Sequence, residues 1–370
     1  MVNIVHCADF HLDCAFSGMQ DSELKKQDLR DTFEAVCQYA VTSNANIALI
    51  CGDFFDNESV TNKTQQFLFS AMARASSVRF FIIPGNHDYY SASSIYALSP
   101  FPQNVHIFKS GGIERIEIPE LNADIYGVAC TSPNSESRLL KGFKVKDNDK
   151  INIMLFHGNL VPQSASDNYY PFSAEEIKET GLDYLALGHI HAFSGINKAG
   201  NTYYAYPGCP EGRGFDETGA KGIISGTVGK SRHNLSFMPV CKRRYEIINV
   251  DITGINDDIA LKEKLSEALS GLKDSAVRVI LTGNISADFF IDTRLLKNNF
   301  NDMYYLEIEN STSILQDMQI LRGERTLKGL FVNNILTDLE KDAEDAEIMQ
   351  KALIYGLSAL SGEGVKSLDN

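Results

Sequence analysis

The sequence lacks the features that mark several classes of protein. No apolar run approaches the roughly 20 residues that cross a bilayer, and no internal repeat or low-complexity segment is present. The seven cysteines are odd in number, scattered, and without a C-x-x-C pair, which argues against a disulfide framework or a zinc ribbon. The segment MVNIVHCADFHLDC carries a histidine and aspartates where a signal peptide is apolar. We therefore expect a soluble, cytoplasmic protein that is not bound to a membrane.

Positive charge is also scarce. The 370 residues contain 34 Lys and Arg against 48 Asp and Glu, a formal net charge of −14. Residues 1–240 hold 19 basic and 26 acidic side chains and residues 241–370 hold 15 and 22, so each part carries −7. Affinity for nucleic acid comes largely from neutralising phosphates, so the overall charge argues against such a partner. Any site for a polyanion must be local.

Apolar runs and helical patterns alternate in the N-terminal part. The runs VNIVHC, NIALIC and VRFFII are separated by helical patterns at about residues 22–43 and in TQQFLFSAMARA, which predicts a sheet covered by helices. The closely spaced runs NVHIFKS, IERIEIP and ADIYGVAC indicate a second sheet, and further short strands follow. We predict that residues 1–240 form two packed sheets with helices outside.

The pattern changes near CKRRYEIINVDITG. Strand, helix, strand, helix and strand signals then follow in order and predict a small α+β unit. From about Gly323 the pattern is almost entirely helical, with apolar positions three and four residues apart.

Polar residues stand at the ends of five apolar runs. The motifs are Asp9-x-His11, Gly52-Asp53-x-x-Asp56, Gly85-Asn86-His87-Asp88, His157-Gly158 and Gly188-His189-x-His191. Loops at strand ends commonly converge to build sites, and residues two apart in extended backbone point the same way. The mixture of carboxylate, imidazole and amide suits Mn²⁺, Fe²⁺ or Zn²⁺ in an open, catalytic site.

Each motif also has a structural explanation when taken alone. Gly-Asp is a common step from strand to turn, and Asn-His-Asp can cap a helix. A single histidine after a strand is more often part of the hydrogen-bonded structure than a ligand. Five such motifs in order, each ending an apolar run, favour the metal site.

Taken in this order, the five motifs resemble those of the calcineurin-like metallophosphoesterases, over roughly residues 1–240. The resemblance implies an α/β (α+β) fold: a four-layer α/β/β/α sandwich (1–240), a smaller α+β capping domain (241–322) and C-terminal helices (323–370). It implies two divalent ions, with Mn²⁺ the first choice and Fe²⁺ or Zn²⁺ as alternatives. One ion is assigned to Asp9, His11, Asp53 and His191, and the other to Asp53, Asn86, His157 and His189.

The same resemblance gives two residues of the third motif a different role. His87 is implied to face the substrate and to serve the leaving group, and Asp88 to orient it. An imidazole held by a carboxylate can supply the proton that a leaving alkoxide needs.

Other stretches bear on the substrate. RDTFEAV (30–36), GDFFD (52–56), GHIHAF (188–193) and YPGCPEGRGFDETGAKG (206–222) resemble the SbcD-type DNA repair nucleases, in particular a YhaO-like branch. The resemblance implies a metal-dependent DNA exo/endonuclease that processes DNA ends. It also implies that an SMC-like, SbcC-type ATPase docks on the C-terminal helices, and it allows for a homodimer. A phosphodiesterase or phosphatase for a small nucleotide or other phosphoester is the alternative, and an inert scaffold is disfavoured because every expected ligand is present.

Several residues have two interpretations. Asp56 stands where some relatives carry a histidine implicated in choosing exonuclease or endonuclease action, so the cleavage mode stays open. Arg213 is a candidate phosphate contact or forms a salt bridge within its loop. Four tyrosines either stack on a terminal base or pack against the fold: Tyr89, which is the substrate-binding candidate, Tyr90, Tyr169 and Tyr170. The basic run Lys242, Arg243 and Arg244 either contacts phosphate or forms a solvated linker.

Overall fold

The computed structural model describes residues 1–16, 22–57, 60–230, 232–286, 289–314, 318–339 and 346–360. The chain forms two compact units. The first comprises Met1–Ile247, Leu272–Arg278 and Met303–Tyr305, and the second comprises Ile248–Gly271, Val279–Asp302 and Leu306–Asn370. The predicted domain boundaries at residues 240 and 322 remain a proposal.

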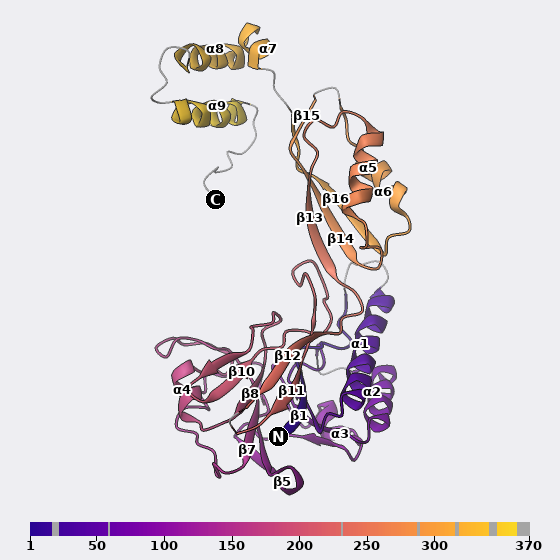
Figure 1. Ribbon diagram of the computed structural model, residues 1–370, viewed down its shortest axis with the longest axis vertical. Coiled ribbons are helices and arrows are strands. Elements are labelled where there is room, and N and C mark those ends of the chain that lie inside the picture. The colour runs from indigo at the N-terminus through magenta and orange to yellow at the C-terminus, as the bar shows by residue number, and fades with distance from the viewer. Residues whose placement is uncertain are drawn as a thin grey trace. The chain divides into compact units, whose positions relative to one another are not determined.

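A six-stranded sheet contains the N-terminal strands of the first unit (Figure 1). Its spatial order is β12 (Asn234–Pro239), β11 (Gly222–Val228), β1 (Val2–Cys7), β2 (Ile47–Cys51), β3 (Arg79–Ile83) and β4 (Val105–Ile107). Strands β1 to β4 are parallel, whereas β11 is antiparallel to both β1 and β12. The carboxyl ends of β1, β2 and β3 therefore lie at one edge of the sheet.

A second six-stranded sheet has a parallel centre and antiparallel edges. Its order is β5 (Glu114–Ile118), β6 (Ala123–Gly127), β7 (Ile151–His157), β8 (Tyr184–Gly188), β10 (Thr202–Ala205) and β9 (Asn197–Ala199). Strands β6, β7, β8 and β10 are parallel, and β5 and β9 pair antiparallel at the two edges.

Successive residues of the central strands face two different cores. Ile4 of β1 packs between the two sheets, while Val5 packs beneath α1 (Ser22–Thr42) and α2 (Asn62–Arg74). This alternation follows from the two-residue period of a strand, and because both faces are covered the strands read as continuous apolar runs. On the outer face of the second sheet, Ile177 of α4 (Ala174–Glu179) packs on the core. These four layers confirm the predicted α/β/β/α fold.

One strand assignment was wrong. The run NVHIFKS was expected in the second sheet, but β4 extends the first sheet, where Phe80 is paired with Val105 and Ile82 with Ile107. A helical segment, α3 (Ile95–Leu98), lies in the connection from β3 to β4. Val105 and Ile107 pack on the core under α1 and α2. This apolar contact places β4 in the first sheet, although β4 is close to β5 in sequence.

The residues after about 241 form the expected strand, helix, strand, helix and strand, together with two short additional strands, β15 (Asn284–Ile285) and β17 (Ser313–Ile314). In chain order the expected elements are β13 (Tyr245–Asp251), α5 (Asp258–Ala268), β14 (Ala276–Thr282), α6 (Thr293–Lys297) and β16 (Tyr305–Asn310). β13, β14 and β16 make a three-stranded sheet, and β15 pairs with β17. The side chains of Asp257 and Asp292 cap α5 and α6 by accepting from backbone N–H groups.

Three helices follow: α7 (Met318–Gly323), α8 (Leu327–Leu339) and α9 (Ala346–Leu360). Val332 of α8 packs against Leu353 and Leu357 of α9 in a small apolar core. No helix in the described part of the chain combines the length and apolarity needed to cross a membrane.

A buried histidine links the two sheets of the first unit. His6 of β1 is fully buried, with Nδ1 2.9 Å from the Tyr184 hydroxyl and Nε2 3.0 Å from the Leu187 carbonyl oxygen. The carbonyl can only accept, so Nε2 carries the proton and Nδ1 accepts from Tyr184. Burial, only partly offset by the bond to Leu187, lowers the pKa of His6 to about 3.

We expect this histidine to make folding sensitive to acid. The unfolded chain binds a proton at its ordinary pKa and the folded chain does not, so stability is lost as pH falls from about 6.5 toward 3. Between pH 7 and pH 5 the loss amounts to about 2 kcal/mol. The free energy of unfolding, measured by urea denaturation in EDTA, should be higher for the natural chain than for His6→Phe at pH 7. This difference should shrink by about 2 kcal/mol when the pH is lowered to 5. Parallel pH profiles for the two proteins would contradict this assignment.

Candidate metal centre

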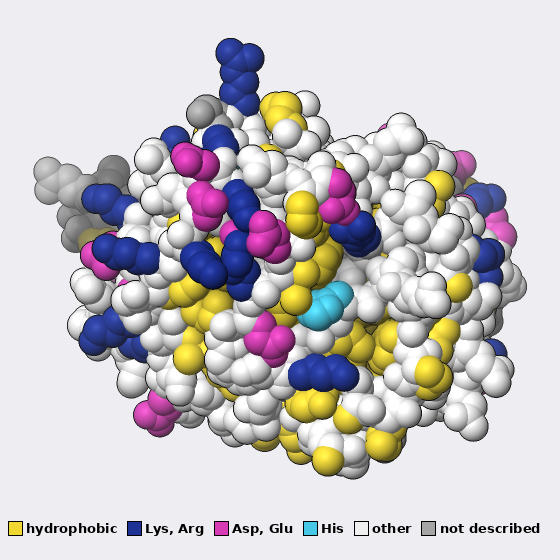
Figure 2. All heavy atoms as spheres, turned by 90° about the horizontal axis from the view of Figure 1, so that it is seen from below, with side chains coloured by type: hydrophobic (Ala, Val, Ile, Leu, Met, Phe, Trp, Pro, Cys, Tyr) yellow, Lys and Arg dark blue, Asp and Glu magenta, His cyan; other side chains and the backbone are white. Residues whose placement is uncertain are grey.

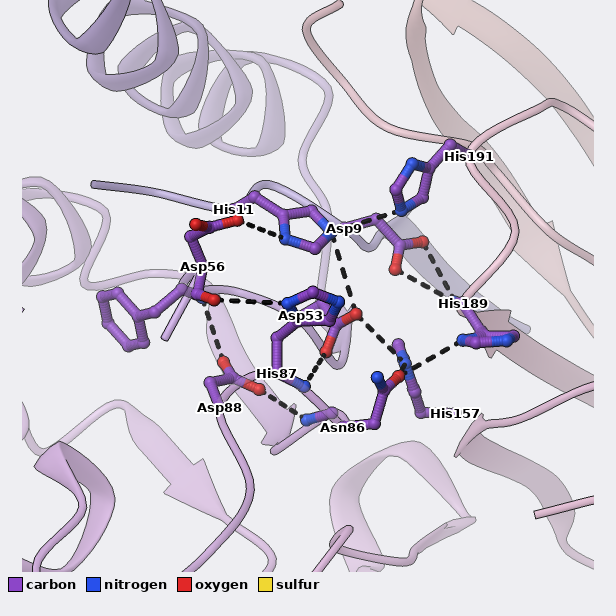
Figure 3. Close-up of polar contacts among 12 residues, drawn as sticks. Asp9, His11, Asp53, Asp56, Asn86, His87, Asp88, His157, His189 and His191 are labelled. Carbon is purple, nitrogen blue, oxygen red and sulfur yellow. Dashed lines mark hydrogen bonds and ion pairs between the residues drawn. The ribbon is translucent and has the colours of Figure 1, made fainter. Parts of the chain in front are cut away.

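Seven side chains from the ends of five strands converge at one place in the first unit (Figure 3). The residues are Asp9 and His11 after β1, Asp53 after β2, Asn86 after β3, His157 at the end of β7, and His189 and His191 after β8. They are the seven metal ligands that the resemblance implied. Their assignment to particular ions is a proposal, whereas their proximity is observed.

The backbone is strained at this place. Asp9, His11, Asp53 and His189 have positive φ angles of 55°, 46°, 47° and 108°. Non-glycine residues adopt this region only when the surrounding structure holds them there, and such residues cluster at functional sites. The fully packed sheets on either side supply that support.

His11 and His191 face each other with their Nε2 atoms 3.2 Å apart. Nδ1 of His11 is 3.2 Å from Asp56 Oδ1, and Nδ1 of His191 is 2.8 Å from Glu217 Oε1. A carboxylate oxygen only accepts, so each Nδ1 carries the proton. Burial lowers the pKa of His11 to about 4, which keeps that ring neutral. The Nε2 lone pairs of the two rings therefore point at each other, and a shared cation would stabilise them.

A second group of acceptors surrounds Asn86. Nδ1 of His157 is 2.9 Å from the Cys51 carbonyl oxygen, and its Nε2 lies 2.9 Å from Asn86 Oδ1 and 3.4 Å from Asp53 Oδ2. His189 Nδ1 is 3.2 Å from the same Asn86 oxygen. Burial opposes a charge on His157, but Asp53 outweighs it and raises the pKa of His157 to about 9. In the absence of metal, the protonated His157 ring donates to Asn86 Oδ1 and lies beside Asp53 Oδ2, and a bound cation would interact with these same oxygens.

The donor set fits divalent metal ions. The ligating atoms of Asp9, His11 and His191 lie within 4.8 Å of one another, as do those of Asp9, Asp53 and His157. A third group joins His11, Asp53 and His87. Asp9, His11 and Asp53 each belong to two of these groups, so the groups overlap in one continuous cluster. Carboxylate, imidazole and amide oxygen are ligands that Mn²⁺, Fe²⁺ and Zn²⁺ accept.

Glycines permit the close approach of these strands. Gly52 has φ of +82°, and a Cβ there would overlap the His157 ring. At Gly188 a Cβ would overlap the Cys51 carbonyl, the group that bonds His157 Nδ1. Both positions require glycine because the strand ends meet with no room for a side chain.

His87 is exposed beside the cluster. Its backbone N–H donates to Asp53 Oδ1 at 2.9 Å, and its ring lies edge-on to His11 with centroids 4.8 Å apart. Its Nδ1 is 3.3 Å from the Asp56 carbonyl oxygen. The side chain is therefore anchored to the centre and open to solvent on one side.

The predicted role of Asp88 is not what the structure shows. Its carboxylate accepts from the backbone N–H of Gly85 at 2.6 Å and of Phe55 at 3.0 Å, and from the Tyr96 hydroxyl at 2.5 Å. The His87 ring has its Nδ1 3.3 Å from the backbone carbonyl oxygen of Asp56 instead. Asp88 thus fixes the loop that carries His87, because the tertiary fold brings buried N–H groups to its carboxylate.

The two substrate-binding candidates have internal partners. Arg213 donates to Glu217 Oε1 at 2.7 Å, which is the salt bridge within the loop, and a phosphate contact remains a proposal. Tyr89 packs on the core under the second sheet. Tyr90 packs on the other outer core and Tyr170 is buried. Tyr169 is 37% exposed, and its ring lies 4.9 Å from that of His189.

In the basic run at 242–244, Lys242 and Arg243 form neither a free phosphate-binding group nor a solvated linker, because both have acidic partners. Arg243 Nε donates to Asp28 Oδ2 at 2.7 Å, and Lys242 pairs with Asp31. Their backbone N–H groups donate to the carboxylate of Glu211 at 2.9 Å and 2.6 Å. The acidic face of α1 and a buried glutamate therefore hold this segment.

Sequence reasoning missed Glu217 and Tyr96. Glu217 lies in the 206–222 stretch that carries the resemblance, four residues after Arg213, and this spacing was the available signal. Tyr96 offered none, since only the fold brings its hydroxyl to Asp88.

Asp88→Ala is expected to lower the free energy of unfolding by about 3 kcal/mol or more, because two buried N–H groups and a hydroxyl lose their acceptor at about 1–3 kcal/mol each. Urea denaturation of metal-free protein measures the change. Tyr96→Phe removes one of the three bonds and should cost about 1 kcal/mol. Natural stability in Asp88→Ala would show that the carboxylate does not hold the loop.

Comparison with known proteins places the chain in a family. A model of the calcineurin-like phosphoesterases matches residues 2–193, more than half of the chain. The metallophosphoesterase YhaO of Bacillus subtilis (strain 168) is 27% identical over 296 residues, which cover 76% of this chain and 72% of YhaO.

Several relatives are named DNA double-strand break repair protein Mre11. That of Methanosarcina acetivorans is 25% identical over 300 residues, 76% of this chain but 46% of the relative. That of Sulfurisphaera tokodaii is 22% identical over 352 residues, 90% of this chain and 88% of the relative. The resemblance inferred from the motifs is confirmed, and this chain belongs to the calcineurin-like phosphoesterases, metallophosphoesterase hydrolases that bind divalent metal ions.

Proposed function

We propose that this chain is a DNA nuclease that hydrolyses phosphodiester bonds at a centre of two divalent metal ions, with Mn²⁺ the first choice. The observation that carries the proposal is the convergence of carboxylate, imidazole and amide side chains from five strand ends beside the exposed His87. The choice of DNA as substrate is supported by the similarity to Mre11 proteins over three quarters or more of the chain.

In this proposal, Asp9, His11, Asp53 and His191 hold one ion, and Asp53, Asn86, His157 and His189 hold the other. When bound, two such ions neutralise the phosphoryl group and activate a water for in-line attack. The ring of His87, fixed through its backbone to Asp53, is exposed where it can donate a proton to the leaving oxygen. Tyr169 offers an aromatic face beside His189 on which a terminal base can stack.

A smaller phosphoester is the second candidate substrate, and the charge distribution favours it. Lys242 and Arg243 are engaged by acidic partners, so they do not form a phosphate-binding stripe. On the face shown in Figure 2, Lys and Arg are interspersed with Asp and Glu rather than gathered into one basic patch. A nuclease with this surface depends on its metal ions, or on a partner, for attraction to DNA.

Digestion of end-labelled linear duplex DNA in Mn²⁺, beside hydrolysis of bis-p-nitrophenyl phosphate, distinguishes the two. We expect both substrates to be cleaved, and His87→Ala to bind Mn²⁺ normally while cleaving DNA about 10²–10⁴-fold more slowly. Isothermal titration with Mn²⁺ is the control for metal binding. Hydrolysis of the small diester alone would favour the second candidate, and full DNA cleavage by His87→Ala would remove His87 from the mechanism.

We also propose that helices α7 to α9 dock an SMC-like, SbcC-type ATPase, which would supply affinity for DNA ends. Leu327 and Leu330, three residues apart on α8, are 70% and 60% exposed, and Ile348 on α9 is 67% exposed. Exposed apolar side chains on paired helices suit recognition of another helix. A homodimer and a cytoplasmic location remain proposals.

Leu330→Asp should abolish co-purification of the full chain with a co-expressed SMC-like ATPase from the same organism, because a charge on the docking face would be desolvated. Helical content measured by circular dichroism should stay unchanged. Undiminished recovery of the ATPase would exclude this face as the docking site.

A further inference from the structure

The loop 206–222 holds a buried carboxylate against one candidate ligand. Glu217 is 5% exposed, and its Oε1 lies 2.8 Å from Nδ1 of His191. Arg213 fixes both oxygens of this carboxylate: Nη2 donates to Oε1 at 2.7 Å and the backbone N–H to Oε2 at 2.8 Å. Since each oxygen has its own donor, the carboxylate cannot turn away from the imidazole.

The same loop holds the backbone of His191. The Lys221 ammonium and the Cys209 backbone N–H each donate to the His191 carbonyl oxygen, both at 3.2 Å. Ring and backbone of His191 are therefore fixed by one segment, which lies about 20 residues away in sequence.

Arg213 also reaches the carboxylate on the other side of the site. Its Nη1 lies 3.7 Å from Asp56 Oδ1, the atom that is 3.2 Å from Nδ1 of His11. Arg213 Nη2 is 3.0 Å from Nδ1 of His191 as well, but that nitrogen carries a proton and cannot accept, so the guanidinium serves the carboxylates. Its positive charge compensates their mutual repulsion.

We propose that Asp56, Arg213 and Glu217 form a carboxylate–guanidinium–carboxylate bridge that positions His11 and His191 for one metal ion. The bridge selects in both rings the neutral tautomer whose Nε2 lone pair faces the same cation. Glu217 is the positioning residue for His191 and need touch neither the ion nor the substrate. The inference rests on the proposed two-metal centre and adds to it the residues that orient one half.

Loss of the Glu217 carboxylate should change the affinity for only one of the two metal ions. Outer partners of a ligating histidine typically change metal affinity about 10–100-fold. The contacts of Glu217 lead to His191, whereas His157 and Asn86 are held by the Cys51 carbonyl and by each other. Loss of Glu217 should therefore weaken one of the two sites and leave the other as it was.

Isothermal titration of the full, chelator-treated chain with Mn²⁺ tests this without reference to activity. We expect two ions in the natural chain, and in Glu217→Ala one dissociation constant raised about 10–100-fold with the other unchanged. Glu217→Gln, which keeps an oxygen to accept from Nδ1–H of His191, should show a smaller rise and covers the case in which the alanine variant does not fold.

Glu211→Ala is the matched control. Glu211 is a buried carboxylate in the same loop, 3% exposed, that accepts from the Thr32 hydroxyl and from the backbone of Lys242 and Arg243. Its loss should lower the melting temperature and leave both Mn²⁺ constants unchanged.

Two results would overturn the inference alone: natural Mn²⁺ constants in Glu217→Ala, or an equal rise in both constants that Glu211→Ala reproduces. Fewer than two ions bound by the natural chain would overturn the proposed two-metal function and this inference with it.

Discussion

Carboxylate, imidazole and amide groups from five strand ends are forced together at the candidate metal centre. The two imidazoles of His11 and His191 meet Nε2 to Nε2 because each uses its only N–H on a carboxylate. Around Asn86 an amide oxygen, a carboxylate and an imidazole nitrogen share one space. Such an arrangement is costly in a buried place unless a cation occupies it, and the rest of the first unit serves to hold it in place.

The sheets make this possible because both faces of each are packed. Strands β1, β2 and β3 end at one edge, and β7 and β8 bring the second sheet to the same place. The inter-sheet core and the contact of His6 with Tyr184 fix one sheet against the other. Positive φ angles at four candidate ligands cost free energy that this packing offsets.

The acidic composition has a structural use in the first unit. Asp28, Asp31 and Glu211 hold the segment at 242–243, and Asp56 and Glu217 orient imidazoles. These carboxylates contribute to the net charge of −14 and have partners within the fold. The overall charge therefore says little about the local potential at the centre.

The sequence by itself determined the layered fold and the candidate ligands. Continuous apolar runs specify strands covered on both faces, and a polar residue directly after such a run lies at the strand end whatever its neighbours are. Asp9, Asp53, Asn86, His157 and His189 could be found for that reason. The tertiary structure decided what depends on distant partners: the sheet that β4 joins, the loop-holding role of Asp88, the engagement of Lys242 and Arg243, and the place of Glu217. The pairs Glu217–His191 and Arg243–Asp28 are 26 and 215 residues apart in sequence. Such pairs leave no local pattern, because packing rather than spacing brings the two groups together.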